Sequence, residues 1–220
     1  VRKEMDMSKR ESCFFFGMTP AGPRESDITK QPAPQPATVV AFVIRSEDKG
    51  RTWEDTPFIL RPPEPHDYLG LQNPPIARMP DGTFLAPGIM KGPGFPSQIG
   101  IFGTENDGMS WAYVSLGAKD PTGFGRIAYP SLLWVPNSEK VLLFGLNTGG
   151  KGYFIGKAES EDGGYSWTEF KPIVAWGQSP WFARRRRGVP VGWQSYRSPW
   201  PLLMKDGRIL LLFARRNGPY

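Results

Sequence analysis

Short apolar runs, each preceded by a polar turn, are the main hydrophobic pattern of this chain. Asp-Gly or Asn-Ser turns at residues 81–82, 137–138 and 206–207 are followed by apolar runs at 83–86, 140–144 and 209–213. Such a run after such a turn is typical of the second strand of a β-hairpin. No stretch shows the 3.6-residue period of an amphipathic helix. The pattern therefore predicts an all-β chain of antiparallel hairpins.

A proline lies seven residues before each of these turns. The three prolines are Pro74, Pro130 and Pro199. Because the offset is constant, we interpret the hairpins as copies of one repeated unit, with the proline in the first strand of each hairpin.

A second repeat supports the same unit. Residues 46–53, 104–111 and 160–167 share the pattern Ser/Thr-x-Asp/Asn-x-Gly-x-Thr/Ser-Trp, and the copies begin 58 and 56 residues apart. A period of this length is typical of one β-propeller blade and too long for a helical hairpin repeat. We therefore expect each blade to carry one copy.

Four positions of this repeat have distinct expected roles. They are Ser46, Asp48, Gly50 and Trp53; Thr104, Asn106, Gly108 and Trp111; and Ser160, Asp162, Gly164 and Trp167. The short polar side chains can bond backbone amides of their own turn, and the glycines can adopt a positive φ. The tryptophans offer an apolar surface at the start of the next strand that can pack between sheets. We expect a structural role, with a surface calcium or carbohydrate site as the alternative.

The octapeptide closely resembles the Asp-box of the sialidase-like (BNR-repeat) propellers. The resemblance implies an all-β propeller of four-stranded antiparallel blades, six in a complete domain, with the Asp-box between the third and fourth strands. We interpret residues 1–220 as a single partial propeller domain. Its expected parts are an incomplete blade at 1–60, blades at 61–116 and 117–174, and an incomplete blade at 175–220. Two whole and two partial blades indicate a fragment, and closure by self-association of two arcs is the alternative.

Composition and charge narrow the functional classes. Gly and Pro are abundant, at 26 and 24 residues, which favours short strands and tight turns. The net charge is +6, with its densest cluster at 184–187. We interpret that cluster as a solvated basic loop or an electropositive rim that attracts an acidic sugar, and we expect no nucleic-acid partner. No apolar run is long enough to span a membrane.

The chain lacks the usual signals of metal and cofactor sites. There is one cysteine and one histidine, and the carboxylates lack EF-hand spacing, so we expect no metal. The segment 145–152 is similar to a phosphate loop but has glycine where serine or threonine is required, so we expect no cofactor.

Candidate chemistry comes from the family resemblance. Sialidase-like enzymes carry the active site at the end of the blades opposite the Asp-boxes, in the loops that we expect at 18–37, 61–73, 91–98, 117–128, 147–152 and 175–197. The place of the family's acid/base aspartate corresponds to Asp27, with Arg24 beside it. The family holds the substrate carboxylate with arginines on inner strands, and Arg197, in an Arg-x-Pro motif, and Arg126 match that role. A solvated loop at Asp27 and a solvent-facing Arg197 are the alternatives.

The resemblance implies a retaining exo-glycosidase for terminal sialic acid or a related acidic sugar. The family's nucleophilic tyrosine and its glutamate have no match here, so we expect the 220 residues alone to be inactive. The alternative is a non-catalytic Asp-box propeller that binds carbohydrate or protein, because propellers host many functions. The sequence leaves open the linkage, the oligomeric state and the compartment, although the resemblance is compatible with a secreted or periplasmic location.

Overall fold

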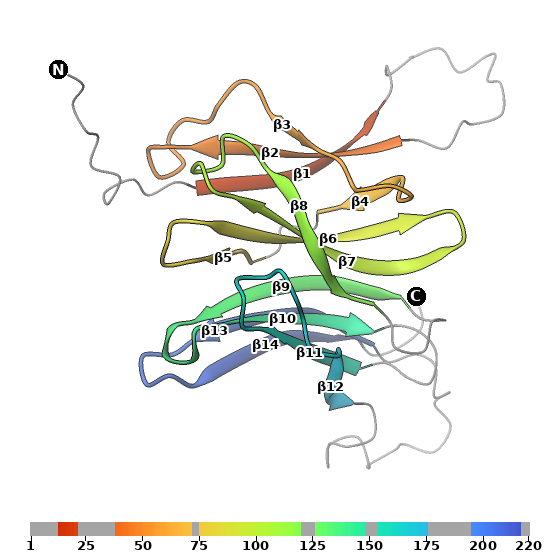
Figure 1. Ribbon diagram of the computed structural model, residues 1–220, viewed down its shortest axis with the longest axis vertical. Coiled ribbons are helices and arrows are strands. Elements are labelled where there is room, and N and C mark those ends of the chain that lie inside the picture. Colours follow the sequence, from red (N-terminus) through yellow and green to blue (C-terminus); the bar gives the residue numbers. More distant parts are fainter. Residues whose placement is uncertain are drawn as a thin grey trace.

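Four antiparallel sheets, stacked in chain order, make up the computed structural model of the protein (Figure 1). The structure describes residues 13–21, 38–71, 75–119, 126–147, 154–175 and 195–216. These residues form strands with one 3-10 turn, Pro136–Ser138, and no α-helix. The predicted all-β class and the antiparallel blades are therefore confirmed.

The first sheet has three strands in the order β1 (Cys13–Ala21), β2 (Thr38–Ser46) and β3 (Phe58–Leu60). Because the first Asp-box lies between β2 and β3, the three correspond to the second, third and fourth strands of an incomplete blade. The last strand was expected to begin at Trp53, but the chain joins β2 only from Phe58 onward. Trp53 lies in the turn region before it and is 40% exposed.

The second sheet shows two errors of the sequence analysis. Its strands are β4 (Tyr68–Gly70), β5 (Ala77–Arg78), β6 (Phe84–Gly92), β7 (Phe95–Thr104) and β8 (Ala112–Ala118). Both β4 and β5 pair with β6, so together they form one inner strand that is interrupted between them. The expected loop at 61–73 therefore contains a strand, and the expected loop at 91–98 is mostly a β-hairpin. Gly94, at φ +77°, allows the chain to reverse there in a tight turn.

The third and fourth sheets continue the series. The third has the order β12 (Lys171–Ala175), β11 (Phe154–Ser160), β10 (Lys140–Asn147) and β9 (Ile127–Val135). The fourth is the hairpin of β13 (Ser195–Leu203) and β14 (Ile209–Arg216), so β13 begins within the segment 175–197 that was expected to be a loop. The apolar runs that follow the polar turns all lie in strands paired as predicted.

Two of the repeated prolines mark irregularities in the inner strands, and the third, Pro74, lies outside the described residues. Tyr129 and Ser198 have φ of +52° and +50°, and each directly precedes a proline, Pro130 or Pro199. The pairing register shifts at both places, in β9–β10 and in β13–β14. Because proline has no N–H to donate to the ladder, it is tolerated at such bulges.

The core lies between the sheets. One cluster joins the first and second sheets, including Phe16, Val43 and Phe102. A second cluster joins the second and third sheets, including Ile101 and Leu143. A smaller one joins the third sheet to the β13–β14 hairpin. Each inner sheet thus buries both faces, as a propeller blade does.

Candidate functional site

Each Asp-box closes on itself through side-chain hydrogen bonds. In the first box, the N–H of Gly50 donates to Ser46 Oγ at 2.7 Å, and that hydroxyl donates to Asp48 Oδ1 at 2.8 Å. The N–H of Thr52 donates to the same carboxylate oxygen at 2.8 Å. Gly50 has φ +82°, as its expected role requires.

The second and third boxes repeat this geometry. The glycine N–H groups donate to Thr104 Oγ1 at 3.0 Å and to Ser160 Oγ at 2.8 Å. Asn106 and Asp162 accept the amides of Ser110 and Ser166 at 3.0 and 2.9 Å. Three copies of the motif therefore build one turn structure.

The two aspartate boxes are electrostatically distinct from the asparagine box. The backbone N–H of Thr52, assisted by the hydroxyls of Thr52 and Ser46, lowers the pKa of Asp48 to about 2. The hydroxyl and then the amide of Ser166 lower the pKa of Asp162 to about 2. Each bond stabilises the ionised carboxylate, whereas Asn106 makes comparable bonds without charge.

The second and third boxes dock on the sheet that precedes them. A Cβ at Gly108 would overlap the ring of Phe14 of β1, and a Cβ at Gly164 would lie 2.9 Å from Leu85 of β6. Trp111 packs edge-on against Phe14 at a centroid distance of 5.5 Å and is only 5% exposed. The Trp167 indole N–H donates to Ser115 Oγ of the second sheet at 3.1 Å. In these two boxes the tryptophan lies between consecutive sheets.

Arg45 joins the first sheet to the second box. Its guanidinium donates two hydrogen bonds to one oxygen of Glu54, at 2.8 and 2.6 Å, and one to the carbonyl of Asp107 at 3.0 Å. The Arg45 side chain is 9% exposed and that of Glu54 is 41% exposed, so this connection between sheets joins a buried arginine to a partly exposed glutamate.

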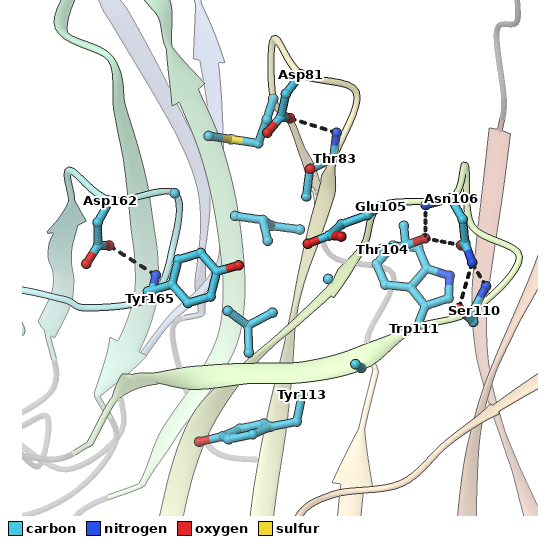
Figure 2. A pocket seen from close by; sticks show the side chains of 16 residues that line it. Asp81, Thr83, Thr104, Glu105, Asn106, Ser110, Trp111, Tyr113, Asp162 and Tyr165 are labelled. Atoms are coloured by element: carbon cyan, nitrogen blue, oxygen red, sulfur yellow. Dashed lines mark hydrogen bonds between the residues drawn. The ribbon is translucent and has the colours of Figure 1, made fainter. Parts of the chain in front are cut away.

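An open cleft of about 760 Å³ lies between the second and third boxes (Figure 2). Tyr165 and Glu105 extend into it from opposite sides. Its lining also includes Asp81, of the β5–β6 turn, and Asp162, of the third box. The Asp-boxes and the polar hairpin turns therefore share one end of the sheets, as predicted. No group of three or more potential ligands among the described residues could hold a metal ion.

Of the predicted catalytic and substrate-binding residues, Arg126 and Arg197 lie at the opposite end. Asp27 and Arg24 lie outside the described residues. Arg126 is exposed and directly precedes β9, and Arg197 is the third residue of β13. Because β9 and β13 are in contact, the two arginines enter neighbouring inner strands from the same end.

A polar cluster at this same end was missed by the sequence analysis. His66 Nε2 lies 3.3 Å from Gln98 Oε1, and the Lys91 ammonium lies 4.6 Å from the centre of the Tyr68 ring. The connection between β3 and β4 packs so closely on the β6–β7 hairpin that a Cβ at Gly92 would meet the backbone there. His66 and Tyr68 lie in the segment 61–73, which was expected to be a loop, and their partners were not predictable because 91–98 was expected to be a loop too.

Comparisons with solved structures show which fold this arrangement represents. A protein of unknown function from Dyadobacter fermentans matches with a TM-score of 0.61 at 19% identity, over 91% of this chain and 52% of that one. A Hadza microbial sialidase matches with a TM-score of 0.58 at 18% identity, over 93% and 37%. Trypanosoma rangeli sialidase in complex with sialic acid matches with a TM-score of 0.54 at 15% identity, over 92% and 32%.

These likenesses show a fold of the sialidase-like, glycosidase β-propeller type. The chain spans about half of the first of these structures and about a third of the other two. No protein-family model matches the chain, and neither does any curated protein. Within its described part, the chain has no helix of the length and apolar character that crossing a membrane requires.

Proposed function

We propose that this chain is part of a sialidase-like exo-glycosidase that removes terminal sialic acid, or a related acidic sugar, with retention. The observation that carries the proposal is the pair Arg126 and Arg197, at the start of two adjacent inner strands, at the end opposite the three Asp-boxes. Two guanidinium groups carried by neighbouring blades would suit a carboxylate that is held by more than one residue.

Each predicted residue has a role in this proposal. Arg197, with Arg126 and Arg24, holds the sugar carboxylate. Asp27 protonates the leaving glycosidic oxygen and then activates water, as one of the two groups that a retaining glycosidase needs. The nucleophile and its base have no assignment in this chain, so we expect ligand binding, without turnover, from the 220 residues alone.

Binding of free sialic acid is the direct test, because it does not require the missing catalytic groups. We expect Arg197→Met to weaken binding at least about tenfold, since a charge-assisted bidentate pair is lost. Isothermal titration calorimetry with the wild type and the variant measures this effect. The matched control is Arg208→Met, which removes the same charge from the turn at the other end of the same hairpin. Equal losses in both variants would contradict the proposal.

Activity of the full-length protein tests the acid/base assignment. A fluorogenic sialoside should be hydrolysed by the parent and at least about a hundredfold more slowly by Asp27→Asn, because general acid catalysis contributes about that much. Equal turnover by both proteins would remove Asp27 from the mechanism.

A non-catalytic binding module is the second candidate. The cleft at the Asp-box end favours it, because Tyr165 is 66% exposed there and offers a ring on which a ligand can stack. Glycan binding that is lost in Tyr165→Ala and retained in Arg197→Met would favour this candidate over the glycosidase.

A further inference from the structure

Tyr68 and Lys91 lie together at the end of the second sheet that is opposite the Asp-boxes. The two residues pair in register across β4 and β6, and the Lys91 ammonium lies 4.6 Å from the centre of the Tyr68 ring. The ring folds back along β4, because a Cβ at Gly70 would lie 2.8 Å from the Tyr68 hydroxyl. The electrons of an aromatic face attract a cation placed over it. The ammonium therefore has a defined position on the sheet.

The backbone of Lys91 is also held in place. The N–H of Asp67 donates to the Lys91 carbonyl at 3.0 Å. At the next residue, a Cβ at Gly92 would lie 2.8 Å from the carbonyl oxygen of Pro65, so the connection between β3 and β4 packs directly on this part of β6. Both the backbone and the side chain of Lys91 are therefore positioned by neighbouring groups.

The side chains of Tyr68 and Lys91 face the third sheet. Leu69 and Met90, the next pair along β4 and β6, belong to the core cluster between the first and second sheets. Because side chains alternate between the two faces of a strand, the Tyr68–Lys91 pair lies on the other face. Lys91 is exposed there.

Arg126 borders the same face from the third sheet. Ile99 of the second sheet and Ile127 of the third each lie 3.2 Å from a Cβ placed at Gly145, so the two sheets meet at this point. The partner of Ile99 in β6 is two residues before Lys91, and Ile127 directly follows Arg126. Lys91 and Arg126 therefore lie on the two sides of one junction between sheets, both beyond this contact toward the end opposite the Asp-boxes.

The charge of Lys91 is not neutralised within the described residues. No carboxylate among them makes an ion pair with its ammonium, which contacts the Tyr68 ring instead. By contrast, Lys140 and Lys157 of the third sheet both pair with Glu159, at 3.2 and 2.6 Å. A positioned cation without a carboxylate partner can bind an anionic ligand without first breaking an ion pair.

We propose that Lys91 is a substrate-binding residue that contacts the carboxylate of the acidic sugar together with Arg126. Tyr68 is a positioning residue, which holds the ammonium in place. This inference rests on the proposed function, because it takes the end opposite the Asp-boxes as the place where the sugar binds. It adds a lysine of the second sheet to the arginines of the third and fourth, and this lysine favours a sugar acid over its neutral ester.

Ligand-observed NMR titration of the full 220-residue chain tests the role of Lys91, with sialic acid and its neutral methyl ester as probes. Lys91→Met should weaken binding of the acid at least about tenfold, because a charge-assisted contact is lost. It should leave binding of the ester equal to that of the wild type. Lys91→Arg, which keeps the charge, should restore most of the affinity for the acid. The matched control is Lys205→Met, which removes an exposed lysine from the hairpin turn at the other end and should bind like the wild type.

Variants of Tyr68 test the positioning role in the same titration. Tyr68→Phe keeps the aromatic face and should bind sialic acid like the wild type. Tyr68→Leu removes that face and should weaken binding about two- to fivefold, which corresponds to the strength of an exposed cation–π contact. Equal binding by Tyr68→Leu and the wild type would contradict the positioning role.

The outcomes separate this inference from the proposed function. If Arg197→Met weakens binding of sialic acid and Lys91→Met does not, the role of Lys91 is overturned and the glycosidase proposal stands. A wild type that does not bind sialic acid at any concentration overturns both. Equal losses of acid and ester binding in Lys91→Met, or a Lys91→Arg variant that binds no better than Lys91→Met, would also overturn the inference. Circular dichroism of each variant checks that the sheets are retained.

Discussion

The first Asp-box and the second differ in surroundings although their turns are the same. In both, a glycine N–H donates to the hydroxyl that opens the box, at 2.7 and 3.0 Å, and both glycines have φ near +82°. Yet Trp53 is exposed, whereas Trp111 is buried against Phe14 and Phe16 of the first sheet.

This difference shows that the motif has two roles. It forms a turn through local hydrogen bonds, and it packs on a neighbouring sheet. The hydrogen bonds join residues within a few positions of one another, so the turn forms wherever the motif occurs. The burial of the tryptophan depends on a preceding sheet, which the second box has and the first lacks within the described residues. The stability that a box contributes should therefore depend on its neighbour more than on its own sequence.

Adding a methyl group to the glycine of each box should give the largest difference in the free energy of unfolding between the two boxes. Gly108→Ala should lower the free energy of unfolding by about 1–3 kcal/mol for the left-handed backbone. The overlap with Phe14 adds a further loss of about 1–3 kcal/mol. Phe14 cannot move away because Phe84 and Trp111 hold it from two sides. Gly50→Ala, with the same φ and no close neighbour sheet, should lose only the backbone part. Urea denaturation measures both, and equal losses would show that docking does not constrain the box.

Truncation of the tryptophans should have the next largest effect. Trp111→Ala should lower the free energy of unfolding by about 3–5 kcal/mol, as expected for a buried aromatic residue. Trp53→Ala should change it by less than about 1 kcal/mol, because the side chain is already partly in water. Urea unfolding at low protein concentration gives both values. A loss at Trp53 as large as that at Trp111 would contradict the difference in burial.

Lowering the pH should affect the two aspartate boxes but not the asparagine box. This is the smallest of the expected effects. Asp48 and Asp162 have pKa values of about 2 in the folded protein, below the ordinary 3.8, so their stabilisation is complete above pH 3.8. It is lost as the pH falls from 3.8 towards 2. In an NMR titration, the amides of Thr52 and Ser166 should shift with midpoints near pH 2, and that of Ser110, bonded to Asn106, should not. Midpoints near pH 4 would show that the turns do not stabilise the carboxylates, and Asn106→Asp should make the second box titrate.

The candidate site was less predictable than the fold. Arg197 could be placed on an inner strand, and Arg126 just before another, because the prolines that follow them repeat in the chain. The contact between His66 and Gln98, by contrast, joins two residues 32 positions apart, and residues 91–98 were expected to be a loop although β6 and β7 form a hairpin there. The assignment of Asp27 and Arg24 stays a prediction.

The sequence by itself determined the all-β class, the blade repeat, the hairpin pairs and the Asp-box turns. These follow from short-range properties: alternating apolar runs, the positive φ of glycine, and hydroxyls placed to bond amides of their own turn. Only the tertiary structure decided that β4 completes the inner strand of the second sheet, and that Trp111 is buried while Trp53 is exposed. The first outcome depends on the pairing of β4 with β6 inside one sheet. The second depends on which sheet lies next to the motif, and three octapeptides of one pattern carry no information about their neighbours.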